Sequence, residues 1–463
     1  MNILLFPGSI PFSTSFLDFD DRVKVILGLP ASFLNGWNSM AAEKISIREI
    51  QNTTLSQGVK VDPNVYIETL KYVMNDYSTY HIVHRGIGSR SLYNYDLLIE
   101  RVVSWSLHIL VKHDVKYVIN HETPHEIVSY IFNRVAEKLG LESYSVRNGA
   151  LPWKGFVQKG VFDGYPLKLP LGNSLSQLDE KKDWLNIEKY LSNRRQDYDK
   201  GIPEYEKKRL DTYKGQIWSW TQEIKMLLRG KKKYVVKAYS MYLKYKMVKK
   251  YRSFETNVFV DDKDFIVFFL HYQPERTTLP EGGVFNQQIL ALKTLRMMLP
   301  AHIAIYVKEH PSTFRFSLSL KARSIEFYSA ITGMDNTFLI PLSTDTYTLI
   351  DKSIFVSTIT GTSILEAVVR GTPSIYFGNI RFKEIPGSFH IQELIESTDL
   401  LNRLLNREII INQDKIDEYF KYTQSISIGQ IQDGKNEFYR PALLNSKIEV
   451  LYNLLKYVSF GEK

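Results

Sequence analysis

The stretch "SIFVSTITGTSILEAVVRGTPSIYFG", residues 353–378, decides the fold of the second half of the chain. Its apolar runs 353–358 and 374–378 flank a segment, 362–370, in which apolar residues recur with helical spacing. A strand, a helix and a second strand in this order form the β-α-β unit from which parallel sheets are built. We therefore predict an α/β fold for this half of the chain.

The same alternation extends in both directions. Further apolar runs predict strands at 2–6, 115–120, 143–146, 265–270, 301–307 and 337–341. Helical spacing predicts helices at 124–141, 285–299, 344–350 and 391–405. Between Asp179 and Tyr251 the sequence is charged and helical, with few strand signals. We predict two facing Rossmann-like, doubly wound domains with a helical insertion between them, which would create a cleft.

The predicted domain boundaries follow these changes of pattern. They give an N-terminal acceptor-side domain (1–175), a basic helical insertion (176–255), a C-terminal nucleotide-sugar domain (256–440) and a last helix (441–463) that packs back on the first domain. The apolar N-terminal run is expected to be a buried strand rather than a secretory signal, because it lacks a basic leader. No run of about 18 apolar residues occurs, so no transmembrane helix is predicted.

Composition excludes several kinds of chemistry. The 463 residues include no cysteine, which excludes disulfides, thiolate zinc sites and cysteine nucleophiles.

The net charge is +9, and the segment Arg229–Arg252 holds ten lysines and arginines and no acid. Such a segment suits an anionic membrane or another polyanion, or else a solvated helix face whose lysine stems cover the core. No nucleic-acid module accompanies it, so nucleic acid is not a predicted partner.

Polar residues follow four predicted strands of the second half. They begin "HYQPERTTLPEGG", "KEHP", "LSTDT" and "ITGTSILEA". Because the carboxyl ends of parallel strands meet at one edge of a sheet, where open α/β sheets bind ligands, these residues are expected to form one site.

The last of these segments predicts a phosphate-binding turn. Free N–H groups at a strand-to-helix turn favour an anion, and a glycine permits close approach. The phosphate-binding candidates are Thr358, Thr360, Gly361, Thr362 and Ser363, and Glu366 one turn later is placed to accept from ribose hydroxyls. The alternative is an ordinary Ser/Thr N-cap with a capping-box glutamate.

Two other strand ends supply further candidates for the same site. Lys308 and His310 can donate to phosphate oxygens, and Pro311 fixes the turn that holds the imidazole. The donor-sugar candidates are Gln273, Glu275 and Arg276. The alternatives are a structural histidine and a loop in which glutamate and arginine pair with each other.

In the first half, "NHETPHE" follows the strand 115–120. His121, Glu122 and His125 cluster there and are candidates for a general base that deprotonates an acceptor hydroxyl. A metal site is the alternative, but the spacing of the histidines straddles Pro124, so helical ligand geometry is not assured. The acidic triplet Asp261, Asp262 and Asp264 precedes a strand and is interpreted as a solvated turn. No metal site and no cofactor are predicted.

Four segments carry a resemblance to a known family. "HYQPERTTLPEGGVFNQQILALKTL", "YVKEHPS" and "STITGTSILEAVVRGTPSIYFG" resemble the second half of bacterial capsule and surface-polysaccharide biosynthesis glycosyltransferases, which have the two-domain GT-B architecture. "VINHETPHEIVSYIFNRVAEKLGL" is similar to the first half of that family. Relatives include transferases that use CMP-Kdo, and the His-Pro pair is similar to a nucleotide-contacting pair in bacterial sialyltransferases. The resemblance implies nucleotide contact by His310, Pro311, Thr360, Thr362 and Ser363, and ribose contact by Glu366.

Together these readings predict a metal-independent GT-B glycosyltransferase. It would move a sugar from a nucleotide-activated donor, CMP-Kdo-like or another, to a growing capsule or lipopolysaccharide glycan, which is either free or lipid-linked. The predicted location is the cytoplasm, with peripheral contact of Arg229–Arg252 on the inner face of the membrane. A CDP-polyol phosphotransferase on a similar scaffold and a non-catalytic nucleotide- or glycan-binding assembly protein are the alternatives.

Overall fold

The chain divides into two compact units. The computed structural model describes residues 2–6, 23–28, 43–54, 61–149, 155–160, 165–167, 180–196, 242, 245–256, 264–275, 277–314, 323–426 and 454. Unit 1 consists of Met1–Ile187, Leu279–Val284 and Glu418–Lys463, and unit 2 of Glu188–Thr278 and Phe285–Asp417. The domain boundaries predicted after residues 175, 255 and 440 stay predictions.

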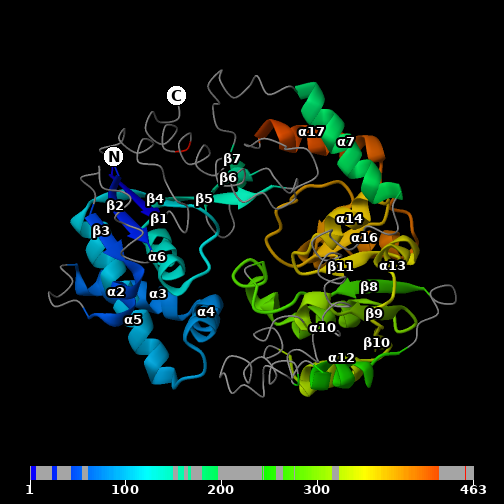
Figure 1. Ribbon diagram of the computed structural model, residues 1–463, viewed down its shortest axis with the longest axis horizontal. Helices are drawn as coiled ribbons and strands as arrows, with labels where there is room; N and C mark the ends of the chain where they lie inside the picture. Colours follow the sequence, from blue (N-terminus) through cyan, green and yellow to red (C-terminus); the bar gives the residue numbers. More distant parts are fainter. Residues whose placement is uncertain are drawn as a thin grey trace, which may run out of the picture. The chain divides into compact units, whose positions relative to one another are not determined.

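Unit 1 is built on a seven-stranded sheet in the order β3-β2-β1-β4-β5-β6-β7 (Figure 1). The strands are β1 (Asn2–Phe6), β2 (Val23–Gly28), β3 (Glu43–Ser46), β4 (Val115–Asn120), β5 (Glu142–Asn148), β6 (Gly155–Lys159) and β7 (Tyr165–Leu167). The first five are parallel, and β6 and β7 add an antiparallel edge. Consecutive residues Ile3, Leu4 and Leu5 of β1 are all fully buried. Because successive strand residues point to opposite faces, both faces of this sheet are covered at β1.

Six helices accompany the sheet of unit 1 in the described part of the chain. They are α2 (Ile47–Asn52), α3 (Pro63–Met74), α4 (Tyr77–Ile87), α5 (Leu92–Lys112), α6 (Ile127–Lys138) and the first part of α7 (Glu180–Gln196). In α5 the buried residues Ile99, Val103 and Leu107 recur every four positions, as expected for a helix that packs with one face. Helix α6 begins at Ile127, later than the predicted start at residue 124, because Glu126 is its extended N-cap residue.

Unit 2 contains a six-stranded sheet, entirely parallel, in the order β10-β9-β8-β11-β12-β13. The strands are β8 (Phe265–Phe269), β9 (Ala304–Lys308), β10 (Thr337–Leu339), β11 (Val356–Thr358), β12 (Ser374–Tyr376) and β13 (Ser388–His390). Ile266 and Phe268 enter one hydrophobic core, whereas Phe265 and Val267 enter another. The sheet of unit 2 is therefore covered on both faces.

Helices supply the second layer of each core in unit 2. They are α10 (Gln288–Met298), α12 (Ile325–Thr332), α13 (Thr346–Lys352), α14 (Ser363–Val369), α15 (Ile391–Glu396), α16 (Thr398–Leu405) and the first part of α17 (Gln413–Ile426), with the 3-10 turns η4 (Gly283–Asn286) and η5 (Pro311–Phe314). Helices α10, α12, α15 and α16 contribute Leu292, Tyr328, Leu394 and Leu401 to one core. Helices α13 and α14 contribute Leu349 and Ala367 to the other.

The predicted α/β class is confirmed, and every predicted strand is present. Strands β2, β3, β6, β7 and β13 were not predicted. The single helix predicted at 391–405 is wrong: Ser397 ends α15 and caps α16, its hydroxyl accepting from the N–H of Leu400 at 3.2 Å. Within the predicted insertion, 180–196 and 245–252 are helical, while 197–241 lie outside the described residues. So does the predicted C-terminal helix, except for Leu454.

Candidate functional site

The strand order of unit 2 determines where its ligand site is expected. The chain starts in the middle of the sheet at β8, runs outward through β9 to β10, then returns to the other side of β8 for β11, β12 and β13. The order therefore reverses between β8 and β11. Ligands of open parallel sheets bind at the carboxyl ends of strands at such a switch point. Here the two strand ends lead into His271 and Thr358.

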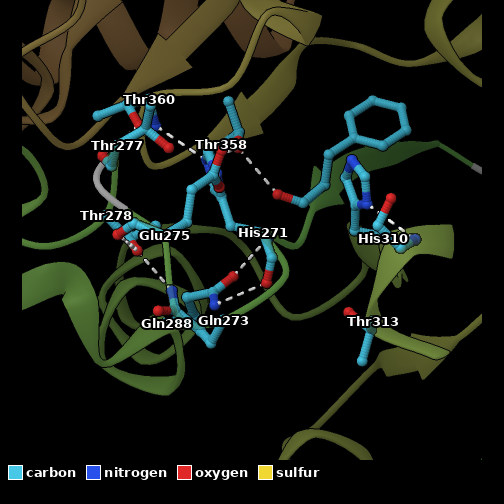
Figure 2. Close-up of polar contacts among 12 residues, drawn as sticks. His271, Gln273, Glu275, Thr277, Thr278, Gln288, His310, Thr313, Thr358 and Thr360 are labelled. Carbon is cyan, nitrogen blue, oxygen red and sulfur yellow. Dashed lines mark hydrogen bonds and ion pairs between the residues drawn. The ribbon is translucent and has the colours of Figure 1, made fainter. Parts of the chain in front are cut away.

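His271 is the centre of the polar contacts at this switch point (Figure 2). Its side chain is buried, and the N–H of Thr360 donates to Nε2 at 3.2 Å. Nδ1 therefore carries the ring proton, and it lies 3.0 Å from Oε2 of Glu275. Thr358 Oγ1 lies 3.1 Å from Nε2. The imidazole thus connects the loop after β8 to the turn after β11.

Glu275 is ionised and belongs to this cluster. Burial alone would raise its pKa, but the interactions of the carboxylate, with the hydrogen bond from His271 foremost, together hold the pKa of Glu275 below its usual value. In the same loop, Nε2 of Gln273 donates to Oγ1 of Thr278 at 2.6 Å.

His310 lies at the end of the neighbouring strand, β9. The N–H of Ser312 donates to its Nδ1 at 3.1 Å, so that Nε2 carries the proton and is the atom able to donate. Pro311 opens the turn η5, which holds this geometry. The ring of Tyr272 lies 5.1 Å from the imidazole, centroid to centroid.

The turn after β11 is tied to the loop after β8 by its threonines. Oγ1 of Thr358 donates to the carbonyl of Phe269 at 2.9 Å, and Oγ1 of Thr360 donates to the carbonyl of Thr277 at 2.5 Å. Both threonines are buried. Each hydroxyl proton is therefore engaged by a main-chain oxygen, and direct phosphate contact by these two side chains stays a prediction.

The other three predicted residues of this turn are Gly361, Thr362 and Ser363. Thr362 is exposed and is the N-cap of α14, yet its side chain makes no capping hydrogen bond. The alternative interpretation as an ordinary side-chain N-cap therefore does not describe this turn. Oγ of Ser363 is buried and has no hydrogen-bond partner within the described part of the chain. A Cβ on Gly361 would lie 3.0 Å from Oγ1 of Thr358, so the turn fits glycine closely.

Two predicted residues of unit 2 point to other partners. The ammonium of Lys308 is buried and donates to the carbonyl of Thr344, and burial lowers its pKa to about 8. Burial likewise raises the pKa of Glu366 to about 7, against the opposing charges of Arg194 and Arg370. Their predicted contacts with phosphate and ribose stay predictions.

The three base candidates of unit 1 do come together. They follow β4, which pairs with β1 at the point where the strand order of that sheet reverses. Nε2 of His121 lies 3.1 Å from Oε1 of Glu122, and Nδ1 of His125 lies 3.8 Å from the same oxygen. Nδ1 of His121 also lies 3.2 Å from the carbonyl of Phe6, at the end of β1. Nδ1 of His125 faces the carbonyl of Thr123 at 3.0 Å, so Nε2 is the atom able to accept a proton.

Sequence reasoning missed His271, Glu309 and Arg323. His271 lies just after an apolar strand, as His310 does, so the same argument from polar residues at strand ends could have identified it. Glu309 and Arg323 form a buried ion pair, with Nε of Arg323 2.7 Å from Oε2 of Glu309. Fourteen positions separate the two residues, so local sequence holds no signal for their pairing.

Several predicted features lie outside the described residues: Arg276, Asp261, Asp262 and most of the basic segment, at 229–241 and 243–244. Asp264 is exposed and lies 3.5 Å from Nη2 of Arg407. Among the described residues, no group of three or more histidines and carboxylates has the geometry of a metal site. None of the described helices is long and apolar enough to cross a membrane.

Each unit has a parallel-rich sheet with a reversal of strand order, as in the two Rossmann-like domains predicted from the sequence. No protein-family model and no curated protein matches the chain. Solved structures that match include the beta Kdo 2,7 transferase KpsC of Thermosulfurimonas dismutans, 13% identical, covering 68% of this chain and 80% of that chain with a TM-score of 0.28. Others are Anabaena HepE in complex with UDP-glucose (13% identity, 99% and 100% coverage, TM-score 0.29) and UDP-GlcNAc 2-epimerase of Methanocaldococcus jannaschii (11%, 100% and 100%, 0.22). A second matching structure from the same organism is the beta Kdo 2,4 transferase of KpsC, 12% identical, covering 60% of this chain and 73% of that chain with a TM-score of 0.27.

Proposed function

We propose that this chain is a metal-independent GT-B glycosyltransferase that moves a sugar from a nucleotide-activated donor, CMP-Kdo-like or another, to a growing bacterial surface glycan. One observation carries the proposal. At the switch point of unit 2, His271 joins Glu275 to the N–H of Thr360, and His310 follows the neighbouring strand β9. These contacts bring His271, His310 and the turn after β11 to the sheet edge where a nucleotide phosphate is expected to bind.

The proposed donor site binds phosphate mainly through main-chain N–H groups and His310. The N–H groups of 361–363, the hydroxyl of Thr362 and Oγ of Ser363 contact phosphate oxygens, and His310 donates from Nε2. A charge-assisted hydrogen bond of this kind contributes about 1.5–3 kcal/mol. Thr358 and Thr360 hold the turn through Phe269 and Thr277. In the proposal, Lys308 adds its charge, Glu366 accepts from ribose, and Gln273, Glu275 and Arg276 orient the sugar.

In the proposal, residues of unit 1 deprotonate the acceptor hydroxyl. His125 accepts the proton of the acceptor hydroxyl at Nε2, and Glu122 with His121 stabilises the charged ring. The acceptor oxygen then bonds to the anomeric carbon as the bond from that carbon to the phosphate oxygen breaks. The nucleotide leaves with the electron pair of that bond, and N–H donors stabilise its phosphate charge as a metal ion would in other enzymes.

The first experiment identifies the donor. Scanning fluorimetry with CMP, CDP, UDP, GDP and their sugars is expected to raise the unfolding temperature with one nucleotide above the others. Mass spectrometry of glycan acceptors incubated with that donor is then expected to show the mass of one added sugar. His310→Ala is expected to abolish transfer while the unfolding temperature stays near that of wild type. The matched control is His302→Ala, an exposed histidine of the same unit.

The outcome of these measurements separates the proposal from its alternatives. Full transfer by His310→Ala contradicts the proposal. Addition of a polyol phosphate instead of a sugar indicates the phosphotransferase, and nucleotide binding without transfer to any glycan indicates an assembly protein. We further propose a cytoplasmic enzyme that meets a lipid-linked acceptor at the membrane through its basic segment. Salt-sensitive liposome binding that is lost when Lys231, Lys232 and Lys233 are neutralised would support this location.

A further inference from the structure

Glu309 lies between two predicted site residues, Lys308 and His310, but its carboxylate points into the core. Its side chain is completely buried. Oε1 accepts from the N–H of His310 at 2.8 Å and from Oγ1 of Thr313 at 3.0 Å. Oε2 accepts from Oη of Tyr328 at 3.0 Å and from Nε of Arg323 at 2.7 Å. Glu309 therefore fixes the main chain of His310 from behind.

Arg323 extends this connection to the neighbouring strand end. Its Nη2 donates to Oε1 of Glu309 at 3.2 Å and to the carbonyl of His271 at 2.5 Å. Gln288 also holds the main chain of His271. Its Oε1 accepts from the N–H of His271 at 2.7 Å, and its Nε2 donates to the carbonyl of His271 at 3.1 Å. The ion pair thus connects the main chain of His271, after β8, to that of His310, after β9.

Burying an ion pair in a protein core costs desolvation free energy. Removing both charges from water costs more than apolar residues of similar volume would, and replacing such a pair with apolar residues is often neutral or stabilising. The pair of unit 2 is therefore poorly explained by stability alone. What it does provide is a rigid distance between the two main-chain segments that carry the imidazoles, because arginine donates in a fixed planar geometry.

We propose that Glu309 and Arg323 are positioning residues of the donor site: they set the spacing between the His271–Glu275 pair and His310. The inference rests on the proposed function and deepens it. Neither residue touches the donor, since both side chains are almost completely buried. Their effect on transfer is exerted through the histidines.

The main test is the double variant Glu309→Leu/Arg323→Met, which removes both charges and leaves neither one unpaired. We expect it to fold, to bind the stabilising nucleotide within about threefold of wild type, and to lose at least about a hundredfold in kcat, which is equivalent to about 3 kcal/mol. KM is expected to change much less than kcat. The matched control, Arg195→Met/Asp417→Leu, removes another arginine–carboxylate pair of unit 2, whose atoms lie 2.9 Å apart, and is expected to retain kcat.

A second readout does not depend on the proposed function. NMR of protein with 13C-labelled histidine is expected to show shifted ring signals of His271 and His310 in the double variant, with that of His302 unchanged. Shifted signals without any transfer by wild type would leave the positioning role supported and the glycosyltransferase proposal refuted. A folded double variant with wild-type ring signals and wild-type kcat overturns the positioning role.

A conservative variant covers the case in which the double variant does not fold. Arg323→Lys keeps a charge for Glu309 but lacks the second arm that reaches His271. It is expected to lower kcat at least about tenfold with little change in KM or unfolding temperature. Wild-type kcat together with unshifted histidine signals in Arg323→Lys would also overturn the proposal.

Discussion

Lys308→Met should remove a pH dependence of stability that wild type shows. Burial lowers the pKa of Lys308 from 10.5 to about 8. Between these two values the unfolded chain binds more protons than the folded chain, so the free energy of unfolding rises with pH. Well below pH 8, burial of the charged ammonium of Lys308 lowers the free energy of unfolding by about 3 kcal/mol. At pH 9.5 the folded chain holds Lys308 uncharged, and wild type has regained about 2 kcal/mol of this loss.

Urea unfolding followed by far-ultraviolet circular dichroism at pH 7 and pH 9.5 measures this effect. The rise between the two pH values is expected to be about 2 kcal/mol larger in wild type than in Lys308→Met. Other groups titrate equally in both proteins and cancel in the comparison. Lys415→Met, a change at an exposed lysine of α17, is the control and should behave as wild type. An identical pH dependence in wild type and Lys308→Met would refute the assignment of Lys308 to a dry site beside Thr344.

Three further changes test other parts of the molecule. Burial raises the pKa of Glu366 to about 7, so the free energy of unfolding of wild type should fall as pH rises from 5 to 8, whereas that of Glu366→Gln should not. Urea unfolding at pH 5 and pH 8 measures this difference. An equal fall in both proteins would contradict it. Gly361→Ala should weaken nucleotide binding at least about tenfold in titration calorimetry, since its Cβ would lie 3.0 Å from Oγ1 of Thr358. In unit 1, Glu281→Gln should lower the free energy of unfolding by about 3–5 kcal/mol, because it removes the carboxylate that neutralises the buried charge of Arg147. Adding Arg147→Met should restore part of this loss in urea unfolding.

The sequence predicted β1, β4 and β5 of unit 1, all strands of unit 2 except β13, and the edge at which the polar residues of unit 2 gather. Apolar runs and helical spacing are local properties, and the rule that ligands bind at carboxyl strand ends needs only the order of elements. The break at Ser397 was missed because the apolar period continues across it from α15 to α16. Strand β13 has no fully buried residue, so it lacks the apolar run that predicts a strand.

What the sequence could not predict is which atoms each polar side chain contacts. Lys308, Glu309 and His310 are consecutive, yet the first donates to Thr344, the second binds Arg323 and the third lies beside Tyr272. Successive residues at a strand end point in different directions, and their partners come from distant segments. The hydroxyl of Thr358 bonds to a carbonyl 89 positions away. Only the folded chain determines these pairings.

The position of Glu275 shows how an anionic ligand can be accepted beside a carboxylate. An isolated negative charge at this point would repel a phosphate, but the carboxylate of Glu275 is paired with Nδ1–H of His271 at 3.0 Å. The pairing also fixes the tautomer of His271, so that Nε2 accepts from the N–H of Thr360 and holds the turn after β11. If this is the role of Glu275, then Glu275→Gln should not strengthen nucleotide binding despite removing a negative charge. An amide can present its oxygen to Nδ1, but it attracts that proton less strongly and anchors the ring less firmly. Calorimetry showing tighter nucleotide binding by Glu275→Gln would mean that the carboxylate acts only as a repelling charge.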